Sequence, residues 1–206
     1  QTLLRVIVTL ALVSGVSVGT GTWIFGVFLW NATLIDFIQL LTVITATMAL
    51  SVVFVSPVTM MFSVFSFRRG LDPDVVVYPI TSPVSDIINT CCYVLSLSLF
   101  FMFGSVGRYL ILLLDIVFIA FVVYIVIRNI GEIKFVETIR EFLLTLVFVT
   151  IIVNITGSLL DRISGLTRAR NIYSVYPAII ATIGGVGSII GSTATTKLAL
   201  GLIKPS

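Results

Sequence analysis

Long apolar runs are the feature of this 206-residue sequence that most limits its fold. The runs recur from end to end, and a helix that crosses a lipid bilayer needs about 20 such residues. Lipid offers no hydrogen-bond partner to backbone N–H and C=O groups, so each run is expected to be helical. The run 110–127, interrupted only by Asp115, also lacks the alternation of a membrane β-strand. We therefore predict an all-α membrane protein.

The composition excludes several other classes of protein. Apolar residues make up 58% of the chain and charged residues 10%, whereas soluble domains contain about 25% charged residues. Histidine is absent, which excludes a His-containing catalytic triad and a His-ligated zinc site. The net charge of +3 is too small and too scattered for a nucleic-acid surface, so no nucleic-acid partner is expected.

Six membrane-spanning helices account for most of the chain. They are predicted at residues 3–30, 37–67, 75–103, 109–127, 142–160 and 173–203. The connector 128–141 carries three basic and three acidic residues and is expected to be a surface helix or a linker.

The basic residues predict how the chain is oriented. Six crossings place both termini on one face, and that face carries eight of the twelve Lys and Arg residues: Arg5, Arg68, Arg69, Arg128, Lys134, Arg140, Lys197 and Lys204. Because Lys and Arg accumulate on cytoplasmic loops, we predict a multi-pass protein of the cell membrane with both termini of this chain in the cytoplasm.

The span 75–103 carries a polar stripe centred on Asp86. Ser82 precedes Asp86 by four residues, and Asn89 and Thr90 follow by three and four, so all four share one helical face. A carboxylate within a membrane is costly unless it meets a cavity or a partner, which makes Asp86 a candidate functional residue. The alternative is an Asp that locks helix packing by a hydrogen bond.

The oxygen-rich surroundings of Asp86 favour a hard cation. Pro83 lacks an N–H and so frees the carbonyl of Pro79, and Mg²⁺ takes oxygen ligands while keeping several of its waters. We predict Asp86 as the metal-binding residue for a hydrated divalent ion. The predicted pore-lining residues are Pro79, Thr81, Ser82, Asn89, Thr90, Gly184, Gly185, Gly187 and Ser188.

Two other spans contain polar residues for which structural roles are expected. Asp115 stands alone in the span 109–127, near the position where Arg108 or water could reach it. Asn154 lies four residues from Thr150 and from Ser158, a spacing typical of hydrogen bonds between membrane helices.

The glycines of the span 173–203 allow two interpretations. Gly187 and Gly191 form a small-xxx-small pair that permits close helix contact. The same glycines could instead expose backbone carbonyls to a pore, with the Ser188 hydroxyl beside them.

Two segments resemble the MgtE family of magnesium transport proteins. The first reads RGLDPD from Arg69 to Asp74 and continues through Pro79-Ile-Thr-Ser82 to Asp86. It is similar to the family's turn and final helix. The second is Pro177–Gly201, PAIIATIGGVGSIIGSTATTKLALG, which is similar to the family's second helix.

The resemblance implies a helical bundle in which Asp86 holds hydrated Mg²⁺ near mid-membrane, in a homodimer or pseudo-dimer. It makes Mg²⁺, or another divalent cation, the transported ion. Residues 1–104 then resemble the last three helices of an MgtE repeat, 105–130 form an extra helix, and 131–206 resemble the first two helices. This order indicates either the middle of a longer two-repeat transporter, which the abrupt ends favour, or a permuted complete protein.

Two other functions compete with transport of a divalent cation. An intramembrane aspartyl-type enzyme would need Asp86 and Asp115 side by side, but nothing around Asp115 resembles an active-site motif. A non-transporting assembly subunit would show small-residue faces without a polar stripe. We therefore predict a channel or transporter and no enzyme.

Overall fold

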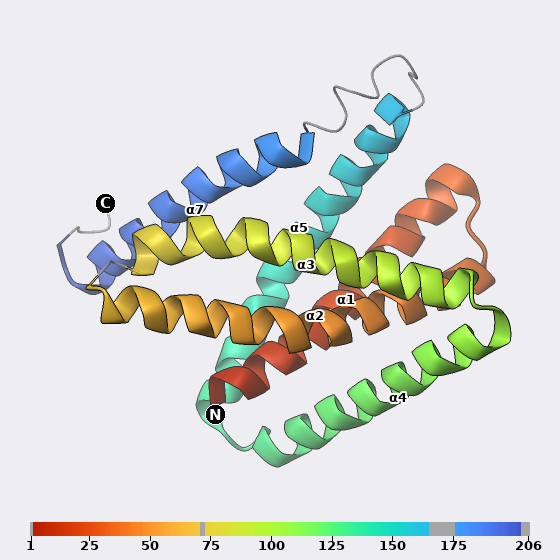
Figure 1. Cartoon of the computed structure of the whole chain (residues 1–206), viewed down its shortest axis with the longest axis horizontal. Coiled ribbons are helices and arrows are strands. Elements are labelled where there is room, and N and C mark those ends of the chain that lie inside the picture. Colours follow the sequence, from red (N-terminus) through yellow and green to blue (C-terminus); the bar gives the residue numbers. More distant parts are fainter. Residues whose placement is uncertain (1, 71–72, 165–175, 203–206) are drawn as a thin grey trace. The chain divides into compact units, whose positions relative to one another are not determined.

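The computed structural model describes residues 2–70, 73–164 and 176–202, and this part of the chain is entirely helical (Figure 1). Its helices are α1 (Thr2–Trp30), α2 (Leu34–Arg68), α3 (Pro73–Phe101), α4 (Gly104–Asn129), α5 (Ile133–Ser164) and α7 (Tyr176–Ala199). A helix therefore lies at each of the six predicted spans.

The distribution of side chains is that of a membrane protein. Among the described residues, five helices, α1 to α5, are long and apolar enough to cross a membrane. Large apolar residues such as Phe28, Ile127 and Leu144 are exposed, whereas Thr9, Thr47, Ser51 and Ser96 are buried. This inversion of the soluble pattern places apolar groups against lipid and polar groups between helices. The predicted all-α membrane fold is confirmed, and α7 stays a predicted span.

The chain divides into two compact units, described separately below. The first unit comprises residues 1–53 and 89–163, and the second comprises 54–88 and 164–206. In the first unit, Val43 and Ala46 of α2, Phe100 of α3 and Ile111 of α4 form a buried apolar core.

A three-residue turn joins α1 to α2. Asn31 has a φ of +53°, a left-handed conformation that asparagine tolerates better than most residues. The Trp23 indole N–H donates to the Thr33 carbonyl at 3.0 Å, and its ring lies 4.9 Å from that of Phe37. Asp36 accepts hydrogen bonds from the Thr33 amide and hydroxyl, which caps the start of α2.

The turn between α3 and α4 depends on glycine. Gly104 has a φ of +61°, which residues with a Cβ adopt only with strain. Beyond the turn, Arg108 donates from Nε to the Phe100 carbonyl at 3.4 Å, and its guanidinium lies over the Phe100 ring. The side chain of Arg108 therefore covers the end of α3.

The connector 128–141 is mostly helix. α4 continues to Asn129 and α5 already begins at Ile133, so the charged residues from Lys134 to Glu141 form the first turns of a long helix. The prediction of a span confined to 142–160 was too short. Lys, Glu and Arg are strong helix formers, and hydropathy alone cannot locate a helix end that lies outside the apolar run.

Candidate functional site

Asp86 is exposed on α3, and the polar stripe predicted around it lies on that same face of the helix. Asn89 and Thr90 are also exposed, and Ser82 is half-buried. α3 continues without interruption through Pro79 and Pro83. Most of the stripe is therefore exposed in the part of the chain that the structure describes.

The other predicted pore-lining residues differ in their surroundings. Thr81 is buried, on a face of α3 other than that of Asp86, and the side chain of Pro79 lies outside the described residues. The predicted positions on α7 are Gly184, Gly185, Gly187 and Ser188, all of them exposed or half-buried. An ideal Cβ built on any of those three glycines would meet nothing within 4 Å. The glycine face of α7 is therefore open within the described chain.

Asp115 is buried on the inward face of α4. Its side chain is 6% exposed, and its neighbours on the same face are Gly107, Ile111, Val122, Ile125 and Asn129. These positions follow one another at intervals of three, four or seven residues, as one helical face requires. The other residues of α4 are mostly exposed and apolar. Asp115 therefore points into the first unit and away from lipid.

The surroundings of Asp115 form a cavity of about 390 Å³ between α1, α2 and α4. Thr42 and Thr45 of α2 contribute its other polar side chains. The Oδ1 atom of Asp115 is buried and has no hydrogen-bond partner. Arg108, which we expected near Asp115, is engaged with Phe100 instead. The sequence did not identify Thr42 and Thr45 as neighbours of Asp115, because they lie about seventy residues away in the chain.

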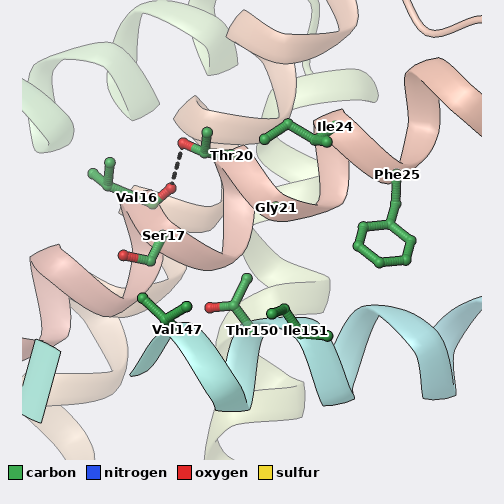
Figure 2. Close-up of a pocket in the computed structure, with 9 residues that line it drawn as sticks. All are labelled: Val16, Ser17, Thr20, Gly21, Ile24, Phe25, Val147, Thr150 and Ile151. Carbon is green, nitrogen blue, oxygen red and sulfur yellow. Dashed lines mark hydrogen bonds between the residues drawn. The ribbon is translucent and has the colours of Figure 1, made fainter. Parts of the chain in front are cut away.

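A second cavity lies between α1 and α5 (Figure 2). It has a volume of about 460 Å³, and its lining combines apolar side chains with the hydroxyls of Ser17, Thr20 and Thr150. Thr20 donates to the Val16 carbonyl, and Asn154 and Ser158 likewise bond to their own helix. Thr150 and Asn154 lie against α1 at Gly21, but the hydrogen bonds of Asn154 and Ser158 lie within α5 and do not join two helices.

Residues 2–96 match the family model of MgtE, a divalent cation transporter. This part of the chain, called the MgtE segment below, is similar to that family. The MgtE segment includes α1, α2 and most of α3, and with them Asp86 and its stripe. The cavity beside Asp115 takes Thr42 and Thr45 from the MgtE segment and Asp115 from beyond it. No curated protein and no solved structure matches the chain.

The long apolar helices support a multi-pass membrane protein, and residues 2–96 are similar to a divalent cation transporter. Within the described residues, no group of three or more Cys, Asp or Glu side chains is placed to hold a metal ion. The described residues therefore contain no site in which several carboxylates could bind an ion that has lost its waters.

Proposed function

We propose that this chain forms a pathway for hydrated Mg²⁺ and that Asp86 is the residue that binds the ion. The observation that carries the proposal is the exposure of Asp86 on a membrane-spanning helix of the MgtE segment. A single carboxylate supplies too little charge to strip Mg²⁺ of its tightly held waters. It attracts the hydrated ion, and the nearby side-chain oxygens of Ser82 and Asn89 accept hydrogen bonds from the ion's waters.

The pathway is completed by a second stripe of the same kind. Asp86 and Asn89 are exposed in the single chain, and a polar stripe facing lipid is costly. We propose that a homodimer, or a second repeat in a pseudo-dimer, covers the stripe, with the open glycine face of α7 beside the pathway. In that arrangement residues 1–104 act as the last three helices of one repeat, 105–130 as an extra helix and 131–206 as the first two helices of another.

The role of Asp86 is tested by Mg²⁺ flux into liposomes that carry the purified protein and a trapped fluorescent indicator. Removing the only carboxylate of the stripe in Asp86→Asn should lower the flux at least about tenfold, the effect of losing about 1.4 kcal/mol of ion binding. Glu137→Gln removes one exposed carboxylate from the start of α5 and should leave the flux unchanged. Unchanged flux in Asp86→Asn, with the protein inserted normally, contradicts the proposal.

The choice of ion is tested in the same liposomes. Mg²⁺ binds its ligands through water more readily than Ca²⁺ does, because it dehydrates reluctantly. Flux should therefore be supported by Mg²⁺ and only weakly by Ca²⁺. Equal or faster flux of Ca²⁺ would show that the site strips the ion of water and would contradict a site for hydrated Mg²⁺.

The orientation of the chain is part of the same proposal. The hydrogen bond between Arg5 and Asn129 holds the start of α1 beside the end of α4, which places both on one side of the first unit. The excess of basic residues assigns that side to the cytoplasm. Glu137→Cys, in a chain with Cys91 and Cys92 changed to Ala, should react with a membrane-impermeant maleimide only after cells are opened. Labelling of this cysteine in intact cells would show that the start of α5 faces outward and would contradict the proposed orientation.

A further inference from the structure

Asp115 combines burial, an unpartnered oxygen and empty space beside it. Its Oδ1 atom has no hydrogen-bond partner, and the cavity of about 390 Å³ adjoins it. Buried polar atoms in folded proteins almost always have a partner, so an orphan atom that lines a cavity suggests a ligand. The divalent-cation site proposed at Asp86 makes no use of this group.

The residues that line the cavity indicate which ligand fits it. Apart from Asp115, Thr42 and Thr45, the lining consists of Leu, Val and Ile side chains from α1, α2 and α4. No lining residue carries a charge that could balance a carboxylate. The charged groups nearest along these three helices are engaged elsewhere: Arg5 with Asn129, Asp36 with Thr33, and Arg108 with Phe100.

A metal ion fits this lining poorly. Mg²⁺ or Ca²⁺ without its waters would need six or more oxygen ligands, whereas one carboxylate and two hydroxyls face the cavity. A hydrated ion would need polar partners for its waters, and the rest of the lining is aliphatic. A proton, by contrast, needs one oxygen atom. It removes the charge, which would cost several kcal/mol at this depth of the membrane, and turns the carboxyl into a hydrogen-bond donor. The Thr42 hydroxyl already donates to the Ile38 carbonyl at 2.9 Å, so its oxygen is available to accept.

We propose that Asp115 is an intramembrane proton-binding site, which takes up one proton from water and releases it to water while the helix bundle stays folded. Uptake breaks one O–H bond of a hydronium ion and forms one on the carboxylate, so Asp115 becomes neutral and the net charge of the chain rises by one. The cavity gives the carboxyl room for a water molecule when it is ionised, and the threonine hydroxyls accept its hydrogen bond when it is neutral. This site is separate from Asp86 and does not depend on the identity of the transported ion.

The proposal is tested by infrared difference spectroscopy on the purified full chain, without any transport measurement. A protonated carboxyl gives a C=O stretching band that a carboxylate lacks. In spectra of the wild type minus Asp115→Asn, we expect one such band in acidic buffer. It should disappear in alkaline buffer and shift in D₂O, because the proton exchanges with solvent.

Two further variants make the assignment specific. Thr45→Val removes a hydroxyl from the cavity and should shift the frequency of the band without abolishing it, whereas Glu137→Gln should leave the band unchanged. A band that neither titrates nor exchanges would identify a permanently protonated structural residue and overturn the proposal. A band that appears only when Na⁺ is removed at constant pH would identify Na⁺ as the occupant and would also overturn it.

Discussion

Arg5 and Asn129 join the first turns of α1 to the last residue of α4. The Arg5 Nη1 atom donates to the Asn129 Oδ1 atom at 2.7 Å, and the Asn129 amide donates in turn to the Ile125 carbonyl at 2.6 Å. Asn129 is 6% exposed. This polar link fixes the register of the two helices, because sliding either helix would leave the buried Asn129 Oδ1 atom without its donor.

This link should contribute measurably to stability. Hydrogen bonds between membrane helices contribute about 0.6 kcal/mol on average and up to about 1.7, so we expect Asn129→Ala to lower the free energy of unfolding by about 1 kcal/mol. Unfolding in mixed detergent micelles measures the change. Arg140→Ala removes an exposed arginine of α5 and serves as the control; equal losses in the two variants would show that the link adds nothing.

The contact between α1 and α5 depends on the absence of a side chain at Gly21. A Cβ at this position would collide with Thr150 Cγ2 and lie 3.0 Å from Asn154 Nδ2. Overpacking of this kind typically costs about 1–3 kcal/mol, and we expect Gly21→Ala to lower the unfolding free energy within that range. Gly157→Ala on α5, where a Cβ meets nothing, should be neutral or stabilising.

A second substitution separates the collision from any general effect at Gly21. Thr150→Ser removes the methyl carbon that the new Cβ would meet, so it should restore part of the stability lost in Gly21→Ala. If the effects of the two substitutions on the unfolding free energy simply add, the methyl group of Thr150 is not what the new Cβ meets. The close contact between α1 and α5 would then be contradicted.

The turn before α4 provides a backbone test. Gly104 has a φ of +61°, where an L-residue with a Cβ is strained by about 1–2 kcal/mol. Gly104→Ala should therefore lower the melting temperature, although a Cβ there would have free space around it. Gly131→Ala, also in a turn but without a positive φ, should leave the melting temperature nearly unchanged. Equal effects at the two glycines would contradict a conformational cause.

The sequence predicted the helices better than it predicted their inward faces. Apolar runs identified each helix in the described part of the chain, because lipid requires about 20 such residues for each crossing. The inward face of α4 was not visible, since lipid-facing residues such as Leu113 and packed residues such as Ile111 are equally apolar and leave no periodic contrast. Asp115 stands out in the sequence as an isolated charge, but Thr42 and Thr45, which line the same cavity, come from a distant helix. The polar stripe around Asp86 could be predicted from local spacing, because its residues lie on a single helix. Its role in binding an ion stays a prediction.

The two sides of α3 should differ in their contact with water. Asn89 lies on the Asp86 stripe, whereas Leu95 comes nine residues after Asp86, about two and a half turns along the helix, and so faces the opposite way. Both residues are exposed in the single chain. In a chain with Cys91 and Cys92 changed to Ala, we expect Asn89→Cys to react with a charged maleimide and Leu95→Cys to remain unmodified in lipid.

Mg²⁺ should slow the reaction at Asn89→Cys, because an ion held at Asp86 occupies the water next to it. Asp86→Asn in the same chain should abolish this protection without abolishing the labelling. Labelling that is equal at both cysteines would mean that the stripe is no more hydrated than the lipid-facing side. In that case the polar face of α3 would pack against another helix and would not line a pathway for ions.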